Sequence, residues 1–270
     1  MDAVTWIGFA IGIGGILLGQ ALEGGAIGAL LQGTAALIVL GGTLGATLVS
    51  TTREDLRTAL RLLLTAFRAD DRAHARRVAA DIAEAAQIAR KDSILALERR
   101  VPGFADPFMQ NVFRFMIDGV EPDVIRDVFE AELDAEEARL LAGAKVWTDA
   151  AGFSPTIGII GAVLGLIHVM NNITDTSKLG SGIAVAFVAT IYGVGLANLV
   201  LLPLGNKIKR KARTGLEVKS MIIEGAVGIA SGLNPHVIQE KIRGYAGLEA
   251  DQSRPRGERL GAAAGDKASA

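Results

Sequence analysis

The chain has 270 residues, of which 50% are hydrophobic and 21% charged, with a net charge of -1 and no cysteine. The missing cysteines exclude disulfides, thiolate metal sites and cysteine nucleophiles, and three scattered histidines lack the spacing of a metal cluster. There is also no phosphate-binding glycine loop and no nucleophile triad. We therefore predict no enzyme, cofactor, metal site or nucleic-acid partner.

Four long apolar stretches contain no Asp, Glu, Lys or Arg. They are 3–22, 24–52, 150–174 and 179–206. A helix needs about 20 residues to cross the hydrocarbon core of a bilayer, and each stretch is long enough. The pattern predicts an all-α membrane protein with four transmembrane helices and a large helical insert between the second and third. The spans are expected over residues 3–22, 27–50, 150–173 and 180–204.

Short turns join the spans into two hairpins, 1–52 and 150–206. Glu23-Gly24-Gly25 makes the first turn and residues 175–178 make the second. Asp2 stands where a signal peptide would carry basic residues, so the first span is expected to be retained. Basic residues follow the second and fourth spans: Arg53, Arg57, Arg61, Lys207, Lys209, Arg210, Lys211 and Arg213. Because segments rich in basic residues near span ends stay in the cytoplasm, both termini and the insert are expected to be cytoplasmic, in a multi-pass membrane protein surrounded by lipid.

The insert, 53–149, is expected to be a helical domain. Its first helix should place one apolar face inward, made of Leu56, Leu60, Leu63, Leu64 and Phe67. A second helix should run from Val78 toward Leu97, and a short one should end at Gly119. Pro122 should open a last helix that continues unbroken into the third span.

The segment after the fourth span, 207–248, is expected to form amphipathic helices. The sequence Gly232-Leu233-Asn234-Pro235 should interrupt them, since Asn-Pro is a turn signal. The remaining residues, 249–270, are polar and small, and we predict a disordered tail.

Small residues form a stripe along the fourth span: Gly182, Ala186, Thr190, Gly193 and Ala197. Span three carries a similar set at Gly158, Gly161, Ala162 and Gly165. Small residues let helices approach closely in lipid, so packing within the chain is the simpler interpretation. The functional alternative is that the stripes face a partner helix or a water path.

Two prolines lie near the same membrane face, Pro155 in span three and Pro203 in span four. Each removes a backbone donor, so together they suggest a hinge, although two independent prolines are also ordinary in membrane helices. Thr156 and Thr190 are the candidate hydroxyls, and each has the alternative of bonding a carbonyl of its own helix. Near the other face, His168, Asn171 and Asn172 are either a polar gate or simply hydrated residues.

The four spans contain no acidic residue. Ion pathways through membranes normally use a carboxylate that changes its charge. If ions flow, we therefore expect the titrating group on another polypeptide.

Arg90 and Glu98 stand out in the insert. Eight residues correspond to a little over two helical turns, so we expect both side chains on one side of a helix. They are either ordinary solvated charges or an electrostatic contact for a partner.

Three blocks now carry a family resemblance, Ser154–Leu166, Gly182–Gly193 and Leu202–Leu204, together with the C-terminal Glu224–Pro235. They resemble the larger subunit of bacterial flagellar stators, the MotA/PomA type of the MotA/TolQ/ExbB proton-channel family. The resemblance covers about residues 1–246.

The resemblance implies a homo-oligomer, a pentamer, around two copies of a peptidoglycan-anchored MotB/PomB-type subunit that supplies the titrating aspartate. Torque would pass to the rotor switch protein FliG, with Arg90 and Glu98 matching the rotor-facing charges. Pro155, Pro203 and Thr190 match channel and coupling positions. Sodium-driven members tend to carry threonines where this chain has Ala162 and Ala189, so protons are favoured.

Two alternatives remain. A TolQ/ExbB-type subunit would power an envelope complex, but those proteins typically have three spans and a different loop arrangement. A membrane scaffold without transport would explain the small-residue stripes but not the paired prolines beside Thr156 and Thr190.

Overall fold

The computed structural model describes residues 3–68, 72–171, 173–174 and 176–245, and the regular elements within them are all helical. Contacts divide the chain into two compact units. The first, here called the membrane unit, comprises Met1–Asp70 and Ala138–Ala212. The second, here called the charged unit, comprises Asp71–Glu137 and Arg213–Ala270. The expected disordered tail, 249–270, and Asp175 of the second turn lie outside the described residues.

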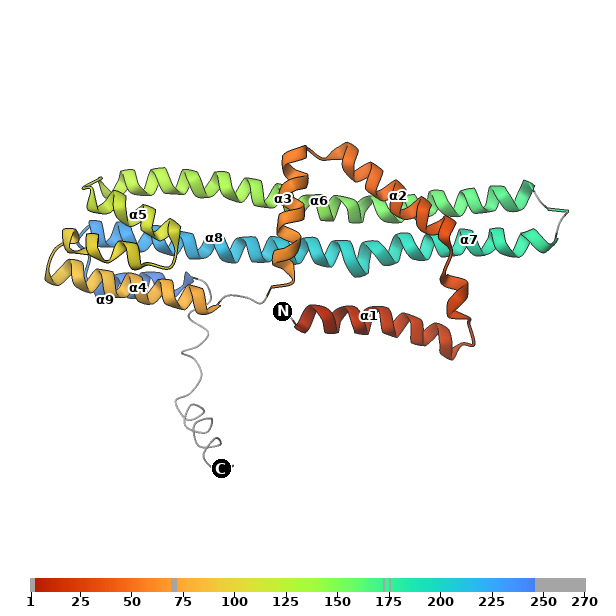
Figure 1. Cartoon of the computed structure of the whole chain (residues 1–270), viewed down its shortest axis with the longest axis horizontal. Helices are drawn as coiled ribbons and strands as arrows, with labels where there is room; N and C mark the ends of the chain where they lie inside the picture. The colour runs from red at the N-terminus through yellow and green to blue at the C-terminus, as the bar shows by residue number, and fades with distance from the viewer. Residues whose placement is uncertain (1–2, 69–71, 172, 175, 246–270) are drawn as a thin grey trace, which may run out of the picture. The chain divides into compact units, whose positions relative to one another are not determined.

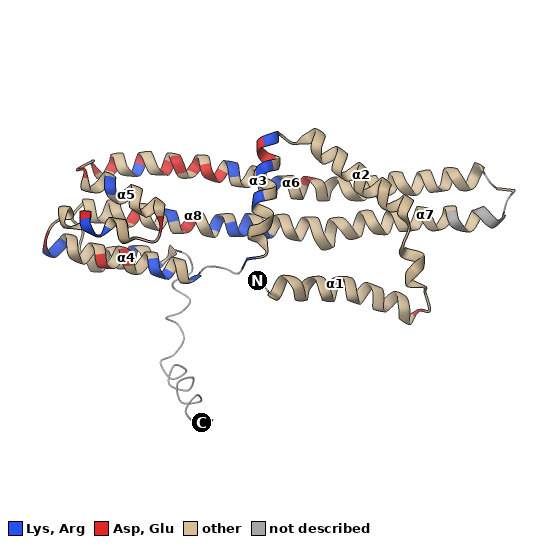
Figure 2. Cartoon of the chain, in the orientation of Figure 1, with Lys and Arg blue, Asp and Glu red and all other residues tan. Residues whose placement is uncertain are grey.

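Four helices are long and apolar enough to cross a bilayer, Ala3–Leu22, Ile27–Ser50, Pro122–Asn171 and Gly182–Ala230. The predicted number of spans is therefore confirmed. Figure 2 shows that α1 (Ala3–Leu22) and α2 (Gly33–Ser50) carry no charged side chain. Charged side chains are frequent instead on α3 (Arg53–Ala66), α4 (Arg72–Lys91), α8 (Leu202–Ala230) and the first half of α6 (Pro122–Asn171).

Helix α6 (Pro122–Asn171) is one element of 50 residues, which corresponds to about 75 Å of helix. The prediction of an unbroken helix from Pro122 into the third span is confirmed. Pro155 lies inside it without ending it. Both α6 and α8 (Leu202–Ala230) contribute residues to both units.

Helix α1 (Ala3–Leu22) buries no residue within the chain. It ends at Leu22. Gly24 follows with a φ of 81°, a value that favours glycine, and the Gly25 N–H donates to the Gln20 carbonyl at 2.9 Å. The chain then forms a short 3-10 helix, η1 (Ile27–Leu30), before α2 (Gly33–Ser50). The second candidate span, Ile27–Ser50, covers the residues expected for it, and it consists of these two helical elements.

The break between η1 and α2 is held by a side chain from another span. The Tyr192 hydroxyl accepts a hydrogen bond from the Gln32 N–H at 3.3 Å and donates one to the Leu30 carbonyl. These contacts satisfy two backbone groups that the interruption would otherwise leave unpaired in an apolar environment.

Helix α3 (Arg53–Ala66) begins with a cap, because the Thr52 hydroxyl oxygen accepts from the Asp55 N–H at 3.2 Å. Its predicted apolar face is only partly correct: Leu63 and Phe67 are half-buried against the core of this unit, whereas Leu60 and Leu64 are 55% and 66% exposed. Leu62 and Ala66 are buried instead, against residues of α6 and α8. The leucine-rich sequence allows either face, and the tertiary partners decide between them.

The expected 53–149 insert is divided between the two compact units. Helix α3 groups with the membrane unit, where Leu62 and Ala66 pack against Ala144, Leu204 and Ile208. The Trp147 indole N–H donates to the Ala59 carbonyl at 3.2 Å.

The charged unit contains α4 (Arg72–Lys91), the 3-10 helices η2 (Ile94–Arg99) and η3 (Val101–Gly103), α5 (Pro107–Ile117), parts of α6 and α8, and α9 (Pro235–Arg243). Phenylalanines fill much of its core: Phe108 and Phe115 both meet Phe129 edge-on, with ring centroids 5.5 and 5.1 Å apart. The predicted short helix before Gly119 and the interruption before Pro235 are confirmed.

The helix expected to continue toward Leu97 ends at Lys91. Ser93 is fully extended and its hydroxyl oxygen accepts from the Ala96 N–H at 3.3 Å, which starts η2 instead. A serine side chain that bonds the backbone locally competes with helix continuation.

Candidate functional site

The third and fourth spans lie side by side (Figure 1), and glycines line the contact between them. A Cβ atom added to Gly193 of α7 (Thr176–Gly195) would lie 2.6 Å from the Ser154 carbonyl oxygen and 2.9 Å from the Gly158 Cα. One added to Gly165 would lie 2.9 Å from the Ala186 nitrogen. The Ser154 hydroxyl, fully buried, crosses the contact and donates to the Gly193 carbonyl at 2.9 Å.

This contact decides between the two interpretations of the small-residue stripes. Gly182, Ala186, Gly193 and Ala197 are buried within the chain, so the packing interpretation is confirmed for them. The expectation that they face a partner helix is wrong for the same residues. The faces that α6 and α7 leave exposed carry large apolar side chains instead, including Ile159, Ile160, Val163, Phe187 and Ile191.

The predicted site residues of span three have different environments. Pro155 and Ala162 are half-buried. Thr156 is exposed, and its hydroxyl donates to the Phe153 carbonyl at 2.7 Å. The oxygen of that hydroxyl keeps its capacity to accept a hydrogen bond from water or a partner.

In span four, Ala189 is completely buried and faces Gly158 and Gly161 of span three. Thr190 is half-buried and its hydroxyl donates to the Ala186 carbonyl at 3.3 Å. Ala189 is therefore a packing residue in this protomer, whereas the Thr190 oxygen can still accept a hydrogen bond.

The fourth span is not one regular helix. Residues Leu196–Leu201 form a π-helix, η4, and the Leu202 N–H donates to the Ala197 carbonyl five residues earlier. Pro203 follows at once, exposed, at the second position of α8. Because proline has no N–H, a regular helical bond at that position is impossible, and the shifted hydrogen-bond register lies directly before it. A π-turn in this place is consistent with a functional irregularity.

Near the other end of the spans lies a cavity of about 270 Å³, lined by Thr34, Ile38, Leu164, Gly165, His168, Gly182 and Val185. His168 thus lies on the wall of this cavity, while Asn172 of the suggested gate lies outside the described residues. Among the residues that the structure describes, no group of three His, Asp or Glu side chains is placed to hold a metal ion.

In the charged unit, Arg90 is exposed near the end of α4 and Glu98 is exposed on η2. The expectation that they share one helix is wrong, because the chain turns at Ser93. Neither has an ion pair with another described residue. The nearby Arg100 guanidinium is 2.7 Å from Glu84, a pair that is half-exposed on both sides.

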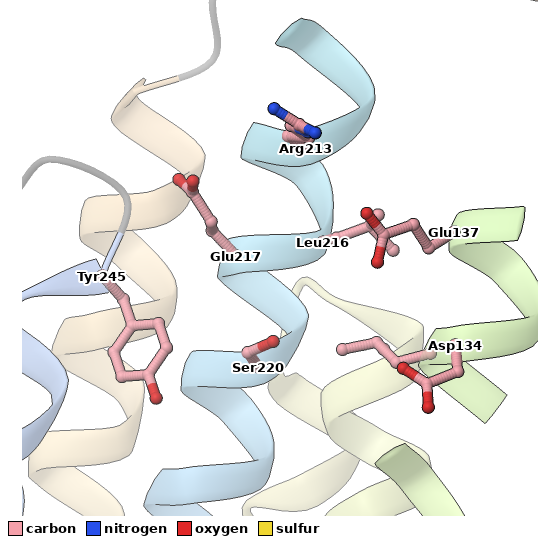
Figure 3. Close-up of a pocket in the computed structure, with 8 residues that line it drawn as sticks. Asp134, Glu137, Arg213, Leu216, Glu217, Ser220 and Tyr245 are labelled. Carbon is pink, nitrogen blue, oxygen red and sulfur yellow. The ribbon is translucent and has the colours of Figure 1, made fainter. Parts of the chain in front are cut away.

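A second polar feature of this unit is a pocket of about 440 Å³ between α6 and α8 (Figure 3). Asp134 and Glu137 line it from α6, Glu217 and Ser220 from α8, and Tyr245 from the segment after α9. Burial raises the pKa of the Tyr245 hydroxyl, with the negative charge of Glu224 adding to the effect. The tyrosine therefore remains neutral in this acidic pocket at physiological pH.

Glu224 joins three helices of the charged unit. It pairs with Arg126 of α6 and, at 2.5 Å, with Lys241 of α9. The Arg126 hydrogen bond is the main reason that the pKa of Glu224 lies below its ordinary value; burial opposes it, and the Lys241 bond reinforces it. The carboxylate thus stays ionised and stabilises the position of α9.

Sequence reasoning missed Tyr192 and Asn198. Both lie inside charge-free stretches, where apolar periodicity hides single polar side chains. An aromatic hydroxyl or an amide within such a stretch indicates a hydrogen bond, because buried polar groups need partners.

A model of the MotA/TolQ/ExbB proton channel family matches residues 101–221, and one of the motility protein A N-terminal region matches residues 6–86. The motility protein A of Bacillus subtilis (strain 168) is 31% identical over 245 residues, 91% of each protein. The chain belongs to the motility protein A family.

Similarity to motility protein A and its relatives extends through both units. The chemotaxis protein PomA of Vibrio alginolyticus is 30% identical over 247 residues, 91% of this chain and 95% of PomA. A chain of the C. jejuni MotAB structure superposes with a TM-score of 0.85 at 29% identity, covering 90% of this chain and 95% of that one. The likeness therefore extends over about nine tenths of the chain.

Proposed function

We propose that this protein is the ion-conducting subunit of a flagellar stator, which converts ion flow into torque on the rotor together with a MotB-type subunit. The observation that carries the proposal is a full-length similarity to motility protein A combined with four spans that hold no carboxylate. The C. jejuni relative is named as part of a MotAB complex, which supports a partner of that kind and an oligomeric assembly.

In this proposal the protein crosses the inner membrane four times, with both termini and the charged unit in the cytoplasm. The basic residues after the second and fourth spans support this orientation. Five copies would surround two copies of the partner, as the family resemblance implies.

The partner would supply the titrating aspartate. Protonation removes its charge and lowers the cost of facing an apolar wall by several kcal/mol. The exposed faces of α6 and α7 offer such a wall, with Ile160, Val163 and Ile191. The charged and neutral forms would then prefer different positions around the ring, and alternation between them would step the rotation.

Pro155 and Pro203 are proposed to couple ion passage to bending of the spans, with Thr156 and Thr190 as hydroxyls of the path. The π-helix before Pro203 supports a deformable segment there. Replacing Pro155 or Pro203 with alanine is expected to spare membrane assembly and sharply weaken motility. Normal swimming of either variant would contradict the coupling role.

Arg90 and Glu98 are proposed to contact the rotor switch protein FliG. Their exposure and the absence of an ion pair with other described residues support this role. Charge reversal at either position should reduce swimming, and a compensating reversal on the rotor should restore it. Loss that no rotor reversal restores would contradict a direct electrostatic contact.

The ion is proposed to be the proton, because alanines occupy positions 162 and 189 and offer no oxygen ligand for sodium. Motility should stop with a proton uncoupler and be indifferent to sodium.

The direct test uses vesicles that hold this protein with or without a MotB-type partner. Ion flux is expected with both subunits and not with this one alone. Flux through this protein without a partner would refute the divided mechanism, and no flux with both would favour a scaffold. The match to the motility protein A N-terminal model favours a flagellar machine over a TolQ/ExbB-type one.

A further inference from the structure

The fourth span exposes one row of side chains along its length: Ile183, Phe187, Ile191, Val194, Asn198 and Leu202. Their spacing of three or four residues places them on one side of the helix. Within this row Asn198 is the polar member. Its position is not near a membrane surface, because Asn198 and Asn206 are eight positions apart in a charge-free stretch, which corresponds to about 12 Å of helix.

Asn198 lies inside the π-helix, and its amide is only partly used. Its Nδ2 donates to the Val194 carbonyl at 3.0 Å, a bond within the same helix. The structure gives its carbonyl oxygen, Oδ1, no partner among the described residues, and the side chain is exposed. An amide with a free acceptor is disfavoured against lipid, because hydrocarbon offers no replacement for the lost bond to water.

We propose that Asn198 is a polar residue of the ion path, where its amide binds the water that hydrates the ion between Thr190 and the basic end of the span. This rests on the proposed function. The amide does not titrate, so it orients water and accepts no proton. The π-turn, a local irregularity typical of functional sites, holds this side chain one turn before Pro203.

Thr190, Val194 and Asn198 follow one another at intervals of four residues, so the Thr190 hydroxyl and the Asn198 amide lie on neighbouring parts of the helix surface. The two groups are eight residues, or about 12 Å, apart along the axis. An ion that leaves the level of Thr190 therefore meets the amide before it reaches Lys207, which lies nine residues further along.

The experiment compares variants in vesicles that contain the complete complex with its MotB-type partner. Flux is measured with a pH-sensitive dye under a proton gradient and, separately, with a sodium tracer under a sodium gradient. Asn198→Leu keeps the size of the side chain and removes its polarity, Asn198→Gln keeps the amide, and Ile183→Leu is the matched control on the same row.

We expect Asn198→Leu to lower the flux about five- to tenfold, because one hydrogen-bonding group leaves the path. The amount of complex in the membrane should be unchanged. Asn198→Gln should recover most of the flux, and Ile183→Leu should match the unmodified complex. Flux through Asn198→Leu equal to that of Ile183→Leu would overturn the assignment.

If Asn198→Leu fails to assemble, Asn198→Asp provides a second test. An aspartate on a hydrated path titrates, so the flux should gain a new pH dependence between about pH 4 and 7. An unchanged pH profile would show that the position faces lipid or a neighbouring copy and would overturn the inference. Absence of flux in the unmodified complex would instead refute the proposed function itself, so the two failures are distinguishable.

Discussion

Replacing Gly193 with alanine tests how closely the third and fourth spans must approach. The added Cβ would lie 2.6 Å from the Ser154 carbonyl oxygen, a backbone atom that cannot rotate away. Ordinary contact begins near 3.4 Å, so the helices must separate locally by about 0.8 Å, which forfeits up to half of the dispersion energy across the contact.

The same separation would lengthen the bond from the Ser154 hydroxyl to the Gly193 carbonyl, now 2.9 Å, beyond hydrogen-bond distance. Its loss costs about 1 kcal/mol, and the steric strain of an extra methyl group adds about 1–3 kcal/mol. We expect Gly193→Ala to destabilise the protein by about 2–4 kcal/mol, and Ser154→Ala to lose the smaller, hydrogen-bond share alone.

Gly195 is the matched control, because it lies two residues away on the same helix and a Cβ there meets no atom within 4 Å. Gly195→Ala should be neutral or stabilising by about 0.5–1 kcal/mol, since alanine favours helix. The assay is unfolding of the purified complex by a denaturing detergent, followed by tryptophan fluorescence. Equal unfolding midpoints for the two alanine variants would refute the close-approach argument.

Three further predictions concern single polar groups. Because the pKa of Glu224 is lowered, its stabilising effect should be complete above the ordinary value of 4.5 and be lost as the pH falls through the lowered value. In chemical unfolding, the free energy of unfolding of Glu224→Gln should therefore fall furthest below that of the unmodified protein at neutral pH, and the two should be equal in strong acid. Tyr192→Phe removes the hydroxyl that bonds Leu30 and Gln32, and should cost about 1–3 kcal/mol and expose the break before α2 to proteolysis; unchanged protease resistance would count against it. Thr43→Val replaces a buried hydroxyl that has no hydrogen-bond partner among the described residues, so it should leave the thermal midpoint unchanged or raise it. A clear fall would show that the hydroxyl has a partner in the assembly.

The spans could be predicted because the absence of charged residues is the strongest sequence signal of a membrane-spanning segment. Stretches without Asp, Glu, Lys or Arg are rare in a chain with 57 such residues, and hydrocarbon strongly penalises each of them. The long helix α6 could be predicted as well, because no helix-ending residue interrupts the sequence between Trp147 and the third span.

Local competition explains the predictions that were wrong. In α3 the leucines cover more than one face, and Trp147 together with Leu204 selects the face of Leu62. At the end of α4 a single serine hydroxyl ends a helix whose apolar spacing continues to Leu97. Neither outcome is encoded in periodicity, because one depends on tertiary packing and the other on one side-chain hydrogen bond.

The close approach of the spans could be predicted from the sequence, but the surfaces that meet could not. Glycine and alanine stripes indicate close helix approach, yet a single sequence does not state which helix approaches. Here Gly158 and Gly193 meet each other, so the small residues set the spacing of spans three and four within one protomer.

This spacing changes what a partner helix would meet. Most of the large side chains left outside are apolar, and the exposed polar side chains among the described residues of these two spans include Thr156, His168, Asn171 and Asn198. An ionised carboxylate is disfavoured against isoleucine and valine and tolerated beside an amide or hydroxyl, whereas the protonated carboxyl is tolerated in both surroundings. On a wall of glycine backbone, exposed carbonyl and amide groups would solvate the charged carboxylate at every position. A wall with few polar groups therefore makes the position of the partner depend more strongly on protonation. The rigid glycine contact behind that wall holds the branched side chains in place while the ion passes.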